Sequence, residues 1–276
     1  MICETIDLYD YFGISRGGND GGYLTVYARE KMGDLPARVR PAMLVIPGGG
    51  YQFVSEREGE PVALRFVAAG YAAFRLNYTI NRTYPTPLIE GSMAMAYIRE
   101  NAEKYCVDPA QVAAVGFSAG GHLTAMLATL FDDENVKKAL GARNVRPDAV
   151  VLSYPVITTG EKTHGGTAET ISGGDAALKK ALSLETRVTA ESSPAFLWHT
   201  YEDNAVPVVN SLLFAQAYIA AGVPCELHVF KRGWHGLSLL SREENPVLEP
   251  AVQRDGVWAE LALSWLASRG FTVREK

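Results

Sequence analysis

An apolar run that leads directly into a glycine-flanked serine constrains this chain more than any other feature. Residues 112–117 read Val-Ala-Ala-Val-Gly-Phe, and Gly116-Phe-Ser-Ala-Gly120 forms a Gly-x-Ser-x-Gly motif ahead of a helix-forming segment. The glycines two residues before and after Ser118 leave room for a tight strand-to-helix turn that holds the serine hydroxyl out for chemistry. The motif therefore predicts a strand, a nucleophilic serine and a helix, in that order.

The same five-residue pattern occurs a second time, at Gly13-Ile-Ser-Arg-Gly17. A glycine-rich stretch, residues 18–22, follows it, and nothing there favours the start of a helix. No buried strand leads into it, because Asp7, Asp10 and the tyrosines between them indicate an exposed edge. Since the motif needs a strand before it and a helix after it, we interpret the match at Ser15 as accidental.

Short, nearly continuous apolar runs alternate with helix-like segments along the rest of the chain. Such runs are expected of parallel strands that are buried on both faces. The alternation predicts an α/β fold with a doubly wound, mostly parallel sheet, helices on both faces, and an antiparallel edge at Leu24–Tyr27. The expected strands are Ala42–Ile46, Tyr71–Tyr78, Val112–Phe117, Asp148–Ser153, Ala195–His199 and Cys225–Phe230, and the expected helices are Pro61–Ala69, Leu88–Tyr105, Gly120–Leu130, Val209–Ala220 and Gln253–Ser268.

One segment, residues 157–193, interrupts this alternation. It contains five glycines and no strand-like run, and we expect one short helix in it near Ala176–Ser183. Long connections are often functional, so the segment is either a lid over the substrate or an ordinary surface insertion. Because no long polar or Pro/Gly-rich linker divides the chain, we expect residues 1–276 to form a single domain.

Composition excludes several classes of partner. The net charge of −5 and the lack of a Lys/Arg cluster argue against nucleic acid and anionic membranes. No apolar stretch approaches the roughly 18 residues of a membrane helix, and the acidic N-terminus is unlike a signal peptide. The three scattered cysteines suit free thiols in a reducing compartment. We therefore expect a cytoplasmic protein, and the sequence leaves homo-oligomerisation open.

A serine nucleophile needs a base to take its proton and an acid to orient that base. On a doubly wound sheet these groups come from loops at the carboxyl ends of strands, in the order serine, acid, histidine. Asp203 follows the strand Ala195–His199, and His235 follows the strand Cys225–Phe230. We prefer Asp203 to Glu202 as the acid, because the shorter carboxylate stands directly before the Asn-Ala-Val-Pro turn. The predicted triad is Ser118, Asp203 and His235.

The other four histidines have simpler interpretations. One helical turn beyond the serine, His122 is expected to bond a nearby loop. The strand residue His199 should hydrogen-bond locally, and His228 should pack or face solvent. The remaining one, His164 in segment 157–193, is either solvated or in contact with substrate.

The oxyanion hole should combine the backbone N–H after the nucleophile, that of Ala119, with one from a loop after an earlier strand. Pro47-Gly-Gly-Gly-Tyr51 is such a loop, and its glycines allow the backbone to approach a substrate closely. Gly49 and Gly50 are the candidate donors, and the sequence does not choose between them.

Three side chains are candidates for contact with substrate, namely Tyr51, Trp234 and His164. Aromatic residues in loops pack more often than they recognise ligands, so this remains a hypothesis. No HExxH pattern, cysteine pair or carboxylate cluster is present, and we expect neither a metal nor a cofactor.

Four motifs in this order resemble the alpha/beta-hydrolase esterases, and in particular the small bacterial acetyl-xylan-esterase-like or lipase/esterase-like proteins. They are Pro47–Tyr51, Gly116–Leu123, Asp203 with Val206-Pro207, and Gly233–Gly236, and the resemblance spans roughly residues 40–267. It implies that Ser118, Asp203 and His235 act as nucleophile, acid and base. Hormone-sensitive-lipase-type esterases usually carry histidine where Pro47 stands. Because proline donates no hydrogen bond, this loop must be positioned from elsewhere.

The motifs predict a serine carboxylesterase that works through a covalent acyl-enzyme and acts on small, short-chain acyl esters. The resemblance adds acetyl groups on xylo-oligosaccharides as the expected substrate. An amidase or peptidase would use the same triad and is the alternative. A carbohydrate-binding module would need a broken triad, and a scaffold protein would not react with a fluorophosphonate.

Overall fold

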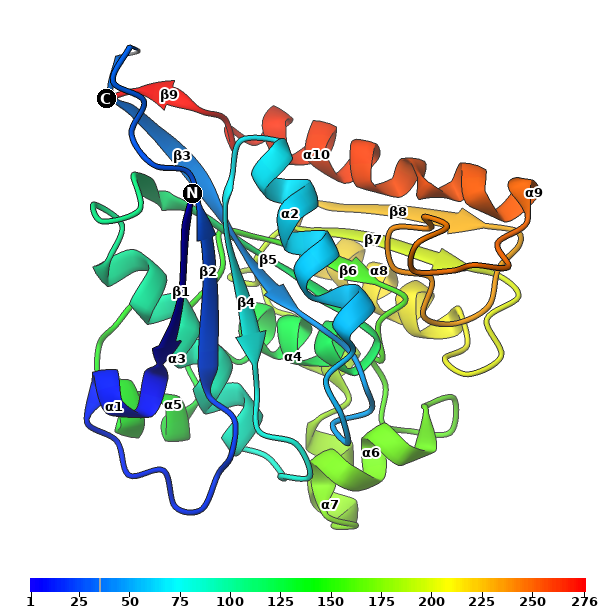
Figure 1. The fold of residues 1–276 in the computed structure, drawn as a ribbon. Coiled ribbons are helices and arrows are strands. Elements are labelled where there is room, and N and C mark those ends of the chain that lie inside the picture. The colour runs from blue at the N-terminus through cyan, green and yellow to red at the C-terminus, as the bar shows by residue number, and fades with distance from the viewer. Residues whose placement is uncertain (35) are drawn as a thin grey trace.

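The computed structural model describes residues 1–34 and 36–276. Among these residues nine strands form one mixed sheet, in the order β1-β2-β4-β3-β5-β6-β7-β8, with β9 paired to the start of β3 (Figure 1). The strands are β1 (Ile2–Asp7), β2 (Tyr23–Ala28), β3 (Arg38–Ile46), β4 (Ala72–Asn77), β5 (Val107–Phe117), β6 (Ala149–Ser153), β7 (Ala195–Thr200), β8 (Cys225–Phe230) and β9 (Arg274–Glu275).

The six strands from β3 to β8 run parallel, whereas β2 is antiparallel to both β1 and β4. This mostly parallel sheet confirms the predicted fold class and the antiparallel edge. The edge is larger than expected, since β1 pairs along its whole length with β2. The strand order reverses at β3, which has β4 on one side and β5 on the other. Ligands of doubly wound sheets bind at such a reversal, beyond the carboxyl ends of the strands.

Helices cover both faces, as the expected alternation requires. In Figure 1 α2 crosses in front of the sheet and α10 lies above β8, whereas α3, α4 and α8 lie behind. Successive residues of β3 serve the two layers, because Met43 and Val45 join the core under α2 and α10, and Leu44 and Ile46 join the core under α3, α4 and α8. The helices are α1 (Leu8–Phe12), α2 (Glu60–Ala68), α3 (Thr86–Glu100), α4 (Ser118–Thr129), α5 (Glu134–Leu140), α6 (Gly165–Ser172), α7 (Ala176–Ala181), α8 (Val209–Ala221), α9 (Pro250–Gln253) and α10 (Trp258–Ser268), with 3-10 turns η1 (Glu56–Glu58), η2 (Leu184–Thr186) and η3 (Arg254–Val257).

Two expected helices are shorter than their apolar patterns suggested. Helix α3 ends at Glu100 rather than Tyr105, although Ala102 and Tyr105 remain buried in the turn that follows. The apolar pattern therefore continues past the end of the helix. The expected helix Gln253–Ser268 begins as α9 and tightens into η3 before α10 starts. Gly256 stands in that 3-10 turn, where its low helix propensity favours a break.

Segment 157–193 contains no strand, as predicted, and it carries α6, α7 and η2. Helix α7 was expected, but α6 was not, because its sequence begins with two glycines that disfavour a helix. The ring of His164 caps α6 by accepting the N–H of Thr167. In Figure 1 α6 and α7 lie apart from the two helical layers, at the bottom of the view. Of the helices described, none is long and apolar enough to cross a membrane.

Candidate active site

The serine of the Gly-x-Ser-x-Gly motif stands at the junction of β5 and α4. Ser118 has a φ of 54°, which few residues other than glycine adopt. A side chain on Gly116 would overlap Thr124 and the Gly120 carbonyl, and one on Gly120 would overlap the Ile46 carbonyl. The turn is therefore open only to glycine at both positions, and it presents the serine hydroxyl at the carboxyl edge of the sheet.

The three residues of the predicted triad come together at this edge. Ser118 Oγ lies 2.7 Å from His235 Nε2, and His235 Nδ1 lies 2.7 Å from Asp203 Oδ2. They arrive on three different loops, after β5, β7 and β8. The order of the hydrogen bonds fixes their direction, because a carboxylate only accepts. His235 therefore donates from Nδ1 to Asp203, and its Nε2 accepts from the serine hydroxyl.

Asp203 is held as a carboxylate by a set of donors. Its Oδ1 accepts the N–H groups of Ala205 and Val206 at 3.0 and 2.9 Å, and its Oδ2 accepts from His235. Burial by itself raises the pKa of Asp203, but the bonds from His199 and His235 outweigh it and hold the pKa well below its usual value. Asp203 is therefore ionised throughout the neutral range and can stabilise a protonated His235.

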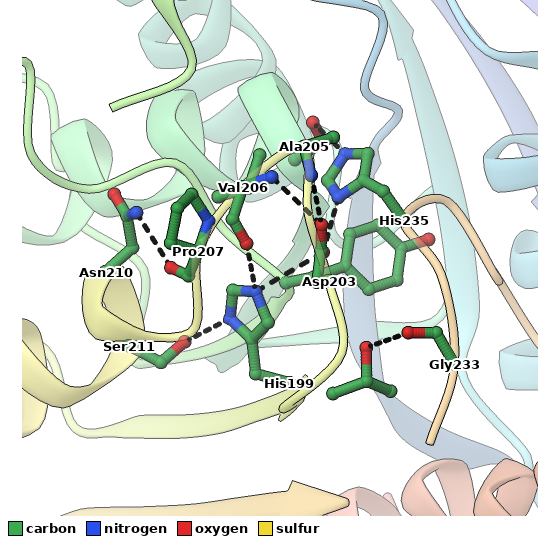
Figure 2. A network of polar contacts seen from close by, with 12 residues as sticks. His199, Asp203, Ala205, Val206, Pro207, Asn210, Ser211, Gly233 and His235 are labelled. Carbon is green, nitrogen blue, oxygen red and sulfur yellow. Dashed lines mark hydrogen bonds and ion pairs between the residues drawn. The ribbon is translucent and has the colours of Figure 1, made fainter. Parts of the chain in front are cut away.

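A second histidine supports the acid from the opposite side. Figure 2 shows Asp203 between the rings of His199 and His235. His199 Nε2 lies 2.9 Å from the Val206 carbonyl and 3.4 Å from Asp203 Oδ2, and His199 Nδ1 accepts from Ser211 at 2.8 Å. Thus His199 forms the local hydrogen bonds that the sequence indicated, and it fixes the turn on which Asp203 stands.

The loop after β3, residues 47–55, is the oxyanion loop. Gly49 and Gly50 have φ values of 123° and 63°, in the region that favours glycine. Within the part of the chain that the structure describes, no protein acceptor takes the N–H of Gly49 or Gly50. Ala119 is the second residue of α4, where a backbone N–H has no partner inside the helix. These are the donors that the sequence predicted, and they remain available.

The support that Pro47 cannot give to this loop comes from three other side chains. Tyr78 donates to the carbonyls of Pro47 and Gly48 at 3.0 and 3.2 Å. The N–H of Gly48 donates to Glu58 Oε2 at 2.8 Å. Tyr51 reaches inward and donates to His122 Nδ1 at 3.0 Å. The loop is thus held from beneath rather than by a histidine at its start.

The placement of Tyr51 differs from the substrate contact that the sequence suggested. Its side chain is fully buried and does not reach the cavity wall, because its hydroxyl is engaged by His122. His122 in turn donates from Nε2 to the Leu182 carbonyl at 3.0 Å. This confirms His122 as a helix histidine bonded to nearby loops, and it makes Tyr51 a support of the oxyanion loop.

A cavity of about 240 Å³ opens directly over the serine. His164 reaches its wall from segment 157–193, as hypothesised. Burial and the nearby His235 lower the pKa of His164, so its ring is neutral at pH 7. Trp234 lines a separate hollow beside Glu202 and Asn204 rather than this cavity. The cavity is lined by Gly49, Gly50, Gln52, Phe53, Ser55, Arg57, Glu58, Ser118, His164, His235 and Gly236.

Sequence reasoning did not single out Phe53, Arg57 or Glu58. The first two stand at the exposed end of the oxyanion loop and just beyond it, where an aromatic or cationic residue has no distinguishing pattern. Glu58 is one of three glutamates at alternate positions, with Glu56 and Glu60, and only the structure shows that it alone is buried. The position of this segment after a buried strand could have marked the loop, but not the residue.

The buried His122 makes a prediction about pH. Burial lowers its pKa to about 4, from an ordinary value near 6.5. As the pH falls between these values, the unfolded chain takes up the proton first, so protonation favours unfolding in this window. We expect His122 alone to remove about 3 kcal/mol from the free energy of unfolding between pH 7 and 4. Urea unfolding at several pH values should show a smaller loss in His122→Gln, and equal losses in the two proteins would contradict the assignment.

The comparisons with known proteins agree with this geometry. The model of the BD-FAE family matches residues 34–218, more than half of the chain. The chain belongs to the BD-FAE family. Its fold is shared by an acetyl ester-xyloside bifunctional hydrolase from Caldicellulosiruptor lactoaceticus, whose crystal structure superposes with a TM-score of 0.83 at 34% identity, over 98% of this chain and 97% of that one.

Two curated relatives of this BD-FAE protein extend the comparison. Endo-1,4-beta-xylanase B of Butyrivibrio fibrisolvens is 42% identical over 212 residues, which are 74% of this chain and 33% of that protein. Acetylxylan esterase of Xylanibacter ruminicola is 31% identical over 206 residues, which are 71% of this chain and 40% of that protein. The chain spans less than half the length of these relatives.

Proposed function

We propose that this protein is a serine carboxylesterase in which Ser118, His235 and Asp203 act as nucleophile, base and acid. The observation that carries the proposal is the unbroken line of hydrogen bonds from Ser118 Oγ through His235 to Asp203, both 2.7 Å long. A hydroxyl becomes an effective nucleophile when a neighbouring imidazole takes its proton as it attacks. Membership of a family with esterase relatives supports the same chemistry.

The proposed reaction has two acyl-transfer steps. Ser118 Oγ forms a bond to the ester carbonyl carbon while its proton passes to His235 Nε2. The carbonyl oxygen takes the negative charge, which the N–H groups of Gly49 or Gly50 and of Ala119 stabilise. His235 then returns the proton to the leaving alcohol as the ester bond breaks. Water repeats the sequence against the acyl-enzyme, with His235 as base, and releases the acid.

The size of the cavity favours a short acyl group. Its volume of about 240 Å³ is below the range of roughly 300–1,000 Å³ that drug-sized ligands occupy. A long fatty acyl chain would extend beyond it. We therefore propose acetyl and similar short acyl esters as substrates.

The alcohol portion of the substrate is proposed to be an oligosaccharide. Phe53 lies at the wall of the cavity with 61% of its surface exposed, and Trp234 is 41% exposed in the hollow that adjoins the histidine loop. Exposed aromatic rings offer a flat apolar face to the C–H face of a sugar ring. Similarity to an acetylxylan esterase and to an acetyl ester-xyloside hydrolase supports acetylated xylo-oligosaccharides.

A substrate panel tests this proposal. We expect the kcat/KM for p-nitrophenyl esters to fall at least about tenfold from acetate to octanoate, because the cavity excludes the longer chain. Acetylated xylo-oligosaccharides should release acetate, and the matched anilide, p-nitroacetanilide, should be turned over far more slowly. Anilide turnover equal to that of the ester would indicate an amidase. A fluorophosphonate should label wild-type protein, and no labelling would contradict serine chemistry altogether.

A further inference from the structure

One buried carboxylate near the site is not accounted for by the triad. Glu58, at the end of η1, is only 3% exposed, although Glu56 and Glu60 on either side face solvent. Its two oxygens are bound by neutral groups, the N–H of Gly48 and the hydroxyl of Tyr154. Burial of a carboxylate is costly unless donors satisfy it, so its place beneath the cavity calls for an explanation.

The hydrogen bonds around Glu58 have one possible direction. The N–H of Ser238 donates to the Tyr154 hydroxyl at 2.9 Å, so the single hydroxyl proton of Tyr154 is directed to Glu58 Oε1 at 2.8 Å. Burial, together with the charge of Glu58, raises the pKa of Tyr154 well above its usual value, so this hydroxyl stays protonated. The N–H of Gly48 donates to the other oxygen, Glu58 Oε2, at 2.8 Å. Both oxygens therefore act as acceptors.

The two ends of this chain of bonds lie in the two halves of the catalytic site. Gly48 directly precedes Gly49, and a bond from its N–H to Glu58 leaves the next two N–H groups for the oxyanion. At the other end, Ser238 is in the histidine loop, residues 231–240, three residues after His235. The Tyr154 ring also packs edge-on against the His235 ring, with centroids 5.0 Å apart.

A second bond reaches the histidine loop from the same side. Ser238 Oγ donates to the carbonyl of Arg57, the residue before Glu58, at 2.6 Å. The two residues that it joins are 181 positions apart in the sequence, and the strands before their loops, β3 and β8, are not neighbours in the sheet. The relative position of the oxyanion loop and the histidine loop therefore depends on contacts of this kind.

We propose that Glu58 is a positioning residue that holds the oxyanion loop and the histidine loop in register through Tyr154. The inference rests on the proposed esterase function and deepens it. Glu58 does not transfer a proton, because each of its oxygens already accepts a hydrogen bond. It acts on the reaction through the placement of the Gly49 and Gly50 N–H groups relative to His235 Nε2.

A double-substitution experiment tests this link. Glu58→Gln, Tyr154→Phe and the double variant are compared with wild type on p-nitrophenyl acetate. Each single change should lower kcat about 10- to 100-fold, with KM nearly constant, because displaced donors stabilise the transition state less. Binding of a trifluoromethyl ketone, which forms an oxyanion with the serine, should weaken by a similar factor. Because both changes break one link, the double variant should resemble the slower single variant.

Tyr218→Phe is the matched control, since Tyr218 is a buried tyrosine whose hydroxyl donates to the Ser193 carbonyl before β7, at the opposite edge of the sheet. It should keep wild-type kcat. If Glu58→Gln does not fold, Tyr154→Phe alone decides, because it retains the ring. Independent effects that multiply in the double variant, or a lowered Tm with unchanged kcat and ketone binding, would overturn the proposal. An inactive wild-type protein would instead contradict the proposed function, and this inference with it.

Discussion

Ser118→Ala is expected to lower kcat on p-nitrophenyl acetate by about 10⁴- to 10⁶-fold. Without Oγ no acyl-enzyme can form, and the remaining rate comes from the oxyanion donors and substrate binding. The fold should persist, because Ser118 Oγ bonds only His235 and alanine occupies the same turn. Steady-state kinetics and circular dichroism would check both expectations. A fluorophosphonate should no longer label the variant.

The second Gly-x-Ser-x-Gly match supplies the control for this prediction. Ser15 is exposed in a loop after α1, whose left-handed cap is Gly13, and no strand leads into it. Ser15→Ala should therefore keep wild-type turnover and fluorophosphonate labelling. Loss of labelling in Ser15→Ala rather than Ser118→Ala would reverse the assignment of the nucleophile.

The triad residues could be selected from sequence because each is tied to a strand end. Buried parallel strands are visible as apolar runs, and their carboxyl ends meet at one edge of the sheet. Asp203 and His235 are the polar groups in the loops after β7 and β8, and the order of motifs limits the alternatives. Ser118 and Ser15 were distinguished in the same way, by what precedes and follows them rather than by the motif itself.

The contacts beneath the site could not be predicted in this way. Glu58 and Glu56 are equivalent in pattern, and the bond from Tyr154 to Glu58 joins residues 96 positions apart. The loop aromatic Tyr51 looked like a residue for substrate contact, and it is buried because His122 offers its hydroxyl a partner. Helix ends were also uncertain, since the apolar pattern of α3 continues beyond its last turn. Each of these depends on tertiary packing.

Asp203→Asn is expected to lower kcat by about 10⁴-fold while leaving KM for small esters nearly unchanged. The amide oxygen can keep the bonds from Ala205 and Val206 only if its NH₂ group replaces Oδ2 and faces His235. A donor at that position requires His235 Nδ1 to accept, so the ring proton moves to Nε2. An Nε2–H cannot take the proton of Ser118, and the attack loses its base. Steady-state kinetics at pH 7 would measure the loss.

Glu202→Gln separates the two candidate acids in the same assay. Glu202 is exposed and reaches the histidine loop only through a 3.4 Å contact with the N–H of Gly233, whereas Asp203 is buried and bonded directly to His235. The substituted amide would retain an acceptor for that N–H and leave the His235 tautomer unchanged, so turnover should stay near wild type. A large loss in Glu202→Gln with an active Asp203→Asn would mean that the histidine is oriented by the other carboxylate. The tautomer of His235 is therefore the property on which the base depends, and Asp203 is the residue that sets it.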